Sequence, residues 1–194
     1  MSSDTADKIF QATHRALCKH GNAKLTMQRI ADESSLSTAA FHYHFETKDE
    51  LLNAFLEHLL SRFEERLAGE AEDPCDRLAT FLEAVFDPVE DRDEEFPIAL
   101  FEIKARAPYE TAYRKRLIEL DERMREAVVS AVRDGIEAGY FAEADPRTVA
   151  RFVVTAINGA HSRQVALDED PAETRELVER YLEQRLGWTP GVVA

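Results

Sequence analysis

A short run of helix signals in residues 26–51 constrains the fold of this chain more than any other segment. Thr26 precedes an apolar-periodic stretch and can cap it, because a threonine hydroxyl accepts hydrogen bonds from the free amides of a first helical turn. The serine-rich turn that follows ends this helix, and Ser37 can cap the next one. Thr47, with Glu50 three residues later, forms a capping box that starts a third helix. Two short helices joined by a tight turn predict a helix-turn-helix unit, whose second helix enters the major groove of DNA.

The second of these helices has one face suited to that role. At about 100° per residue, Ala39, His42 and Tyr43 fall on the same face. Phe41 and Phe45 fall elsewhere and are expected to anchor the helix on its neighbours. The face is therefore small at its start and carries hydrogen-bonding rings at its end. The competing interpretation is that the tyrosine and the histidines only pack or face solvent.

The predicted contacts follow from the chemistry of the side chains. Thr38 and Ala39 offer methyl groups that suit a thymine methyl, and hydroxyls, rings and amines reach phosphate oxygens. His42 and His44 are two residues apart and do not face each other on a helix, so no metal site is predicted here. The predicted DNA-binding residues are Thr26, Gln28, Ser37, Thr38, Ala39, His42, Tyr43, His44 and Lys48.

The segment resembles the N-terminal signature of the tetracycline-repressor (TetR) family of transcriptional regulators. The resemblance is carried by Ile30-Ala31, Leu36-Ser37, Tyr43-His44-Phe45, Lys48 and Glu50-Leu51. Ser35 stands where the family usually has a turn glycine, which allows for some strain because serine tolerates a left-handed backbone less well. Thr38 and Glu46 stand where lysine is common, and His42 replaces a frequent tyrosine. These departures put the individual base and phosphate contacts in doubt but leave the motif intact.

The rest of the chain reads as helix throughout, with no stretch that alternates convincingly as a strand. The seven glycines and seven prolines fall mostly at breaks between helical patterns, and residues 87–95 read as a charge-rich loop. The predicted fold is all-α with about nine helices. A three-helix DNA-binding head occupies residues 1–48, and a larger helical body for effector binding and dimerisation occupies residues 49–194.

The formal net charge of −14 at first argues against a nucleic-acid partner. Its distribution does not, because residues 1–48 hold six Lys and Arg against five Asp and Glu, a net charge of +1. The acid is concentrated in the remainder, and the chain has 18 Arg against 6 Lys. Acid excess with scarce lysine suggests adaptation to molar salt, with an ordinary acidic cytoplasmic protein as the alternative. Base contacts and shape readout would then matter more than ion pairs with phosphate, whose contribution falls as salt rises.

The two last helical segments have wide apolar stripes, with Gly159 among small residues that allow close approach of another helix. The resemblance implies that these helices form a four-helix bundle with the same pair from a second subunit; the alternative is that they only complete the core of the monomer. The predicted dimer-interface residues are Phe152, Ala156, Ala160, Arg163, Leu177, Tyr181 and Leu182.

The middle helices are expected to enclose a pocket for an unknown small-molecule effector, although an aromatic stripe at helical spacing is more often plain core. The candidate lining residues are Phe81, Val85, Phe86, Phe96, Leu100, Ile103, Tyr113, Met124, Phe152, Thr155 and Asn158. The C-terminal half most resembles the subgroup of choline-responsive betaine repressors, a resemblance that does not name a ligand. The family mechanism implied is a dimeric repressor, released from a palindromic DNA operator when the effector shifts the population of two states.

Other classes of protein are disfavoured. The chain has no Gly-rich phosphate loop, nucleophile elbow or ligand cluster of metal spacing, so neither an enzyme nor a cofactor is predicted. Cys18 and Cys75 have no redox or metal spacing. No signal peptide and no apolar run near ~18 residues are apparent, so we expect a soluble cytoplasmic protein without a membrane partner. The remaining alternative is a dimeric helical ligand-binding or interaction protein without DNA binding.

Overall fold

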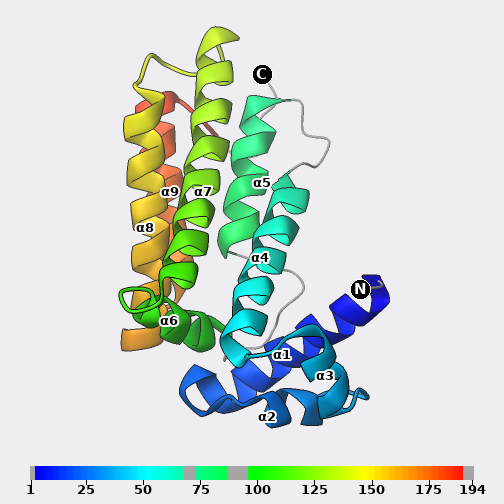
Figure 1. The fold of residues 1–194 in the computed structure, drawn as a ribbon. Helices are drawn as coiled ribbons and strands as arrows, with labels where there is room; N and C mark the ends of the chain where they lie inside the picture. Colours follow the sequence, from blue (N-terminus) through cyan, green and yellow to red (C-terminus); the bar gives the residue numbers. More distant parts are fainter. Residues whose placement is uncertain (1–2, 68–72, 87–95, 190–194) are drawn as a thin grey trace. The chain divides into compact units, whose positions relative to one another are not determined.

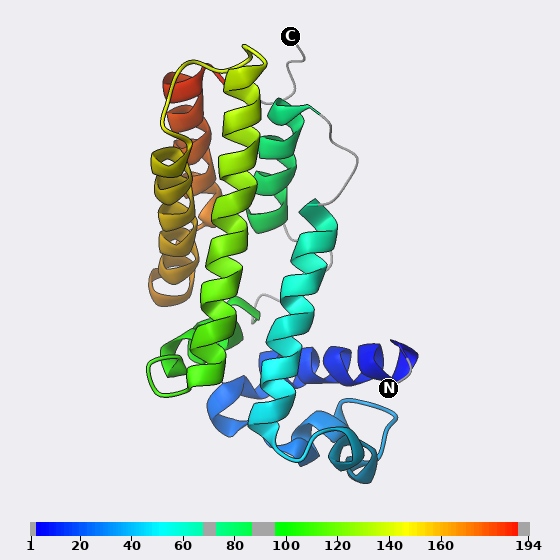
Figure 2. The same cartoon turned by 45° about the horizontal axis from the view of Figure 1, so that its top comes forward.

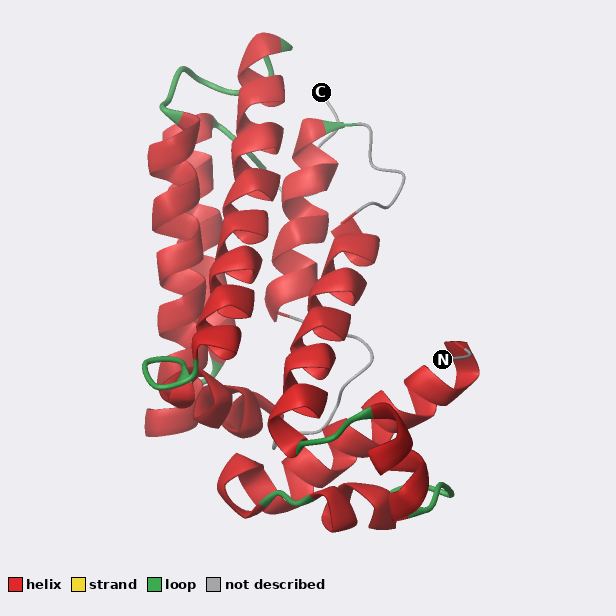
Figure 3. Ribbon diagram, viewed as in Figure 1, coloured by secondary structure: helices red, strands yellow, loops and turns green. Residues whose placement is uncertain are grey.

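A computed structural model describes residues 3–67, 73–86 and 96–189. In these ranges the regular structure is helical and no strand occurs (Figure 3). The nine helices described are α1 (Ser3–Lys24), α2 (Met27–Asp32), α3 (Thr38–His44), α4 (Lys48–Leu67), α5 (Pro74–Phe86), α6 (Phe96–Arg106), α7 (Thr111–Glu137), α8 (Pro146–Leu167) and α9 (Pro171–Leu186) (Figure 1). The all-α prediction is therefore confirmed; the predicted charge-rich loop at 87–95 lies outside the described residues.

Local caps set the boundaries of the two C-terminal helices. The Asp145 carboxylate accepts hydrogen bonds from two amides of the first turn of α8, and Pro146 occupies the first helical position, where its missing N–H is not needed. A hydrogen bond from the Thr148 hydroxyl, followed by those amides, lowers the pKa of Asp145. Asp170 caps α9 in the same way, and Gly187 ends it in a left-handed conformation.

The described residues divide into two compact units, each with its own hydrophobic core. One unit lies within residues 1–61 and 93–118, and the other within residues 62–92 and 119–194. Along the chain, α4 and α7 each begin in the first unit and end in the second. The predicted boundary between residues 48 and 49 falls inside the first unit, which also contains α6.

The core of the first unit is built mainly by α1 and α4. α1 packs against α2 and α6, and α2 packs against α3. Most buried side chains on these helices are apolar, with Thr13, His14 and Asn22 of α1 as the polar exceptions, and α6 contributes Ile103 to the apolar cluster. Tyr113 from the start of α7 closes the core, and its hydroxyl donates to Asp49 Oδ1 at 2.8 Å. Burial, and then this hydrogen bond to a carboxylate, raise the pKa of Tyr113 well above its usual value.

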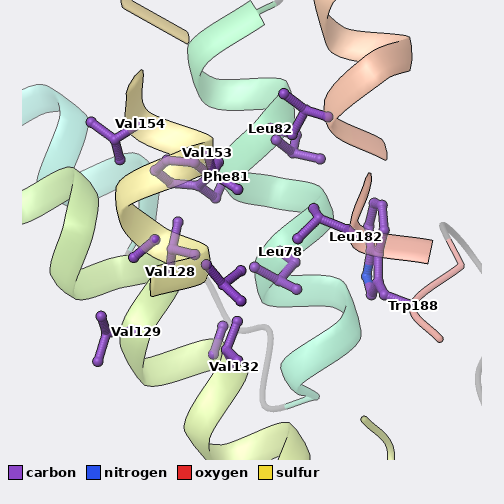
Figure 4. Packing of buried hydrophobic residues seen from close by; sticks show 14 of the residues in the cluster. Leu78, Phe81, Leu82, Val128, Val129, Val132, Val153, Val154, Leu182 and Trp188 are labelled. Atoms are coloured by element: carbon purple, nitrogen blue, oxygen red, sulfur yellow. The ribbon is translucent and has the colours of Figure 1, made fainter. Parts of the chain in front are cut away.

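The second unit is a bundle of α5, α8, α9 and most of α7, which run alongside one another in both views (Figures 1 and 2). Phe81, Val128, Val153 and Leu182 bring one buried side chain each from these four helices into its core (Figure 4). Trp188 is fully buried after α9, and its indole N–H donates to the carbonyl of Cys75 at the start of α5, at 3.1 Å.

Candidate nucleic-acid interface

The two short helices of the predicted motif are capped by the side chains that the sequence predicts. Thr26 Oγ1 accepts from the Arg29 amide at 3.2 Å at the start of α2. Ser37 Oγ accepts from the Ala40 amide at 3.3 Å at the start of α3. Such a cap contributes about 1 kcal/mol, which is large for helices of six and seven residues that are too short to be stable alone.

The turn between these helices is closed by a serine side chain. Ser34 Oγ accepts from the Leu36 amide at 2.9 Å and donates to the Ala31 carbonyl at 3.2 Å. Apart from glycines, the only described residue with a positive φ is Asp168, so Ser35 is not in the left-handed region. The expectation of strain at Ser35 is therefore wrong, because the hydroxyl of its neighbour shapes the turn and no glycine is required.

The capping box that follows the motif forms as a reciprocal pair. The Glu50 amide donates to Thr47 Oγ1 at 3.1 Å, and the Glu50 carboxylate accepts from the Glu46 amide at 2.8 Å. The amide that it reaches lies one residue before the capping threonine. The pair satisfies free donors where the chain enters α4 and so fixes the path from α3 into that helix.

One side of α3 is anchored in the core of the first unit. Phe41 is fully buried and Phe45 is almost so, as predicted for the two anchors. The Phe45 ring lies with its centroid 6.4 Å from that of Phe10 on α1. Phe10 of α1 therefore helps to hold the end of α3, and its ring also lies near the ring of Phe55 on α4.

The opposite side of α3 faces solvent. Ala39 and His42 are exposed, and Tyr43 is 85% exposed, so the alternative that its ring packs in the core is excluded. The ring of His44 meets that of Tyr43 edge-on, with centroids 4.9 Å apart. Small and hydrogen-bonding groups thus occupy one accessible face of a capped helix, which is the arrangement that a recognition helix needs.

Two predicted contact residues on neighbouring helices bind each other. The Thr38 hydroxyl donates to Gln28 Oε1 at 2.9 Å, and the amide nitrogen of Gln28 donates to Asp32 Oδ1 at 2.7 Å. These bonds tie α2 to α3 and hold the glutamine in one orientation. Lys48, the predicted phosphate contact at the start of α4, donates from its ammonium group to the Asn22 carbonyl at 3.4 Å.

Basic residues of α1 hold the end of α2. Lys19 pairs with the Glu33 carboxylate at 2.8 Å, and the Arg15 guanidinium donates to the Glu33 carbonyl at 2.6 Å. Arg29 donates to the Lys24 carbonyl at 2.5 Å. Cations near the last carbonyls of a helix stabilise it. Part of the positive charge of the head therefore serves the fold, which leaves largely neutral groups on the exposed face of α3.

Comparison with known proteins agrees with this geometry. Residues 9–55 match the family described as bacterial regulatory proteins, tetR family. Residues 74–187, more than half of the chain, match the family described as BetI-type transcriptional repressor, C-terminal. The chain belongs to the TetR family. It is a helix-turn-helix transcriptional regulator, from a family of regulators that are not enzymes.

Solved structures and curated relatives extend this result. A TetR transcription regulator from Haloarcula marismortui is 40% identical and has a TM-score of 0.88, over 95% of this chain and 99% of that one. A transcriptional regulator from Saccharomonospora viridis, solved in complex with choline, shares the fold with a TM-score of 0.83 at 18% identity, over 95% and 98% of the two chains. An HTH-type regulator from Bacillus subtilis is 28% identical over 70% of this chain. The chain spans at most about half the length of two curated relatives it matches.

The structure distributes the predicted effector-lining residues of this TetR regulator over both units. Leu100, Ile103 and Tyr113 belong to the core of the first unit, and Phe81, Val85, Phe86 and Met124 belong to that of the second. The other described candidates, Phe152, Thr155 and Asn158, are exposed on α8. The side chain of Phe96 lies outside the described part. Their role in ligand binding remains a prediction.

The predicted dimer residues also separate into two groups. Phe152 and Leu177 are exposed, and Tyr181 is half-buried, with its ring centroid 4.0 Å from that of Phe152. Ala156 is half-buried and Arg163 is exposed, paired with Glu169 in the same subunit. Ala160 and Leu182 are buried within the subunit itself. As an interface, all seven remain a prediction.

Sequence reasoning missed the polar contacts that connect distant helices. Glu102 on α6 accepts hydrogen bonds from backbone amides at the end of α1, and Arg77 on α5 pairs with Asp134 on α7 at 2.5 Å. In a chain with 38 acidic residues, neither acid stands out. Gly21 is the one local signal in the sequence, because glycine is common where a helix ends. No helix among the described residues is long and apolar enough to cross a membrane.

Proposed function

We propose that this TetR regulator is a homodimeric repressor that binds a palindromic operator through α3 and is released by a small-molecule effector. The observation that carries the DNA contact is the exposed face of α3, with Tyr43 and His42 in solvent on a helix held by a cap and two buried phenylalanines. A two-fold dimer presents two such helices to successive major grooves, which explains why the operator would be palindromic.

The dimer is supported by apolar surface on α8 and α9. Phe152 and Leu177 lie on these helices and expose large apolar areas beside the ring of Tyr181. Gly159 lies on α8, and among the described residues a Cβ added to it would meet no atom within 4 Å, the neighbouring backbone of its own helix aside. An open glycine among apolar side chains allows a second helix to approach closely. We therefore assign this surface to the same surface of a second subunit.

The effector is proposed to bind among the helices of the body. Choline in the Saccharomonospora viridis regulator makes a quaternary ammonium compound the first probe to use. Aromatic faces bind such cations, and Phe81 and Phe86 are candidate aromatic residues on α5. Tyr113, in contrast, has its hydroxyl bonded to Asp49, which favours a structural role for this residue.

The function can be tested by selecting bound fragments from the fragmented genomic DNA of the host, at low and at molar salt. Enrichment of one palindrome would support a sequence-specific regulator. A folded dimer that enriches no sequence at either salt would instead support a ligand-binding or interaction protein without DNA binding. Glu46, in place of a frequent lysine, favours that second outcome.

Single substitutions then test whether the exposed face of α3 contacts DNA. Tyr43→Phe removes one hydroxyl from each head, and a lost hydrogen bond of about 1 kcal/mol per head corresponds to roughly 30-fold weaker binding by a dimer. His42→Ala should weaken binding at least as much, because a larger group is lost. Tyr109→Phe is a matched control, since Tyr109 is 87% exposed but lies in the turn before α7. If the Tyr43 and His42 variants bind like wild type, this face of α3 does not contact DNA.

A further inference from the structure

The end of α1 is broken by Gly21, which adopts φ 66° and ψ 163° inside the helical run. This backbone conformation is in the region that favours glycine. The break separates Asn22 and Ala23 from the regular hydrogen bonding of α1. Their amides therefore behave like the free donors at the start of a new helical turn and need partners from elsewhere.

Those partners come from a helix that lies about 80 residues away in the sequence. The Glu102 carboxylate on α6 accepts a short hydrogen bond from the Asn22 amide and a second one, at 3.2 Å, from the Ala23 amide. One carboxylate oxygen thus does what an N-cap side chain does, but from a distant helix. Hydrogen bonds to a charged acceptor are stronger than neutral ones, so this cap is well suited to hold α1 and α6 together.

Gly21 is required at this point for two reasons. A Cβ added to it would lie 2.9 Å from a Glu102 carboxylate oxygen, closer than a real Cβ contact. Its positive φ would in addition strain any other residue. Gly21 and Glu102 therefore act together. The positive φ of Gly21 breaks the helix before the Asn22 and Ala23 amides, and its lack of a Cβ leaves room for the Glu102 carboxylate that binds them.

The same peptide segment is held from α4. Lys48 donates from its ammonium group to the Asn22 carbonyl at 3.4 Å, and the Leu25 amide donates to that carbonyl at 3.3 Å. Asn22 is itself buried. The segment lies just before Thr26, the cap of α2. Groups from α4 and α6 thus converge on the connection that leads into the helix-turn-helix unit.

We infer that Glu102 is a positioning residue for operator binding, which fixes the connection between α1 and α2 by capping the amides of Asn22 and Ala23. This inference rests on the proposed DNA-binding function. Through these hydrogen bonds α6, which lies outside the DNA-binding motif, directly contacts the segment that precedes α2. Without the carboxylate, the connection between α1 and α2 samples other conformations, and the fraction of molecules whose α2 and α3 fit the operator falls.

The inference can be tested on the full-length protein with Glu102→Ala, Glu102→Gln and Gly21→Ala. Glu110→Gln is the matched control, because Glu110 lies in the same unit and its carboxylate pairs with Arg106. Amide hydrogen exchange without DNA reads the cap directly. We expect exchange of the Asn22 and Ala23 amides to rise at least about tenfold in Glu102→Ala and Gly21→Ala, less in Glu102→Gln, and not in the control.

Operator affinity then tests the positioning role. It is measured well below the unfolding temperature, at a concentration where each variant is dimeric. We expect about tenfold or greater loss for Glu102→Ala and Gly21→Ala, a smaller loss for Glu102→Gln, and less than twofold for the control. Unchanged exchange of the two amides, or faster exchange with unchanged operator affinity, would overturn the inference. A wild-type protein that selects no DNA would overturn both the regulator function and this role, while the exchange result alone would still decide whether Glu102 caps α1.

Discussion

Leu177→Ala tests the proposed dimer at the most exposed large apolar residue of α9. Leu177 is 58% exposed, whereas the neighbouring Val178 is buried in the subunit. Burying a whole leucine side chain contributes about 1.5–3 kcal/mol, so covering the exposed share contributes about 1–2 kcal/mol. A two-fold interface contains the residue twice. The substitution should therefore weaken dimerisation by about 2–4 kcal/mol, or about 30- to 900-fold in Kd.

Sedimentation over a range of protein concentrations measures this change. Ile118→Ala is the control, because Ile118 is 49% exposed but lies on α7. Its dimer Kd should stay within about threefold of wild type, and the thermal stability of both variants, compared at a concentration where neither is dimeric, should match that of wild type. A dimer constant unchanged by Leu177→Ala would refute the assignment of this surface to a second subunit.

Gly159→Ala provides a second, independent reading of the same surface. Within the subunit the new methyl group meets open space, so the higher helix propensity of alanine should stabilise the monomer by about 1 kcal/mol. In a dimer whose helices come close at this glycine, the same methyl group separates them and weakens association. A more stable monomer that dimerises more weakly would therefore support the interface. A more stable monomer that dimerises equally well or better would argue against close approach at Gly159.

Four further outcomes are expected. Gly135→Ala places a Cβ 2.2 Å from the Phe141 ring. The cost of this overpacking should exceed the gain in helix propensity, so calorimetry should show a free energy of unfolding lower by about 1–2 kcal/mol. Tyr113→Phe removes the hydrogen bond to Asp49 and should destabilise the first unit by about 1 kcal/mol in chemical denaturation. Burial, with nearby carboxylates, raises the pKa of the Cys75 thiol to about 11 from 9.0. At pH 8 its thiolate fraction is then about 100-fold lower than that of an unperturbed thiol, so alkylation of Cys75, followed by mass spectrometry, should be slower than that of a free cysteine by about the same factor. Because the exposed face of α3 is mostly neutral, the slope of log affinity against log salt should be no steeper than about −4 for the dimer.

The head could be predicted from the sequence because its determinants are local. A cap, a turn and a capping box are each decided by residues within four positions of one another, as Ser37, Ser34 and Glu50 show. Anchoring by Phe41 follows from helical periodicity, which separates its direction from that of Tyr43. Short-range rules therefore suffice for the two helices that carry the proposed DNA contact.

The body was harder to predict because periodicity says which face of a helix is buried but not what covers it. Ile103 was expected to line a ligand pocket, and in the structure it lies in the same core as the DNA-binding helices. Phe152 lies in an apolar stripe with Val153 and Val149, which are buried, yet it is 46% exposed. The stripe is wider than the face that packs within one subunit, and only the folded arrangement shows where packing stops.

The distribution of charge connects these observations to DNA binding. Several basic side chains of the head hold helices together, as Arg15 and Lys19 do at Glu33, so part of its positive charge serves the fold instead of meeting phosphate. In dilute salt this would be a disadvantage, because counterion release supplies much of the affinity for DNA. In concentrated salt that contribution shrinks, while hydrogen bonds and apolar contacts to bases are less affected. A head that places a tyrosine and a histidine in solvent, on an otherwise acidic protein, is therefore consistent with recognition through contacts that keep their strength at high salt.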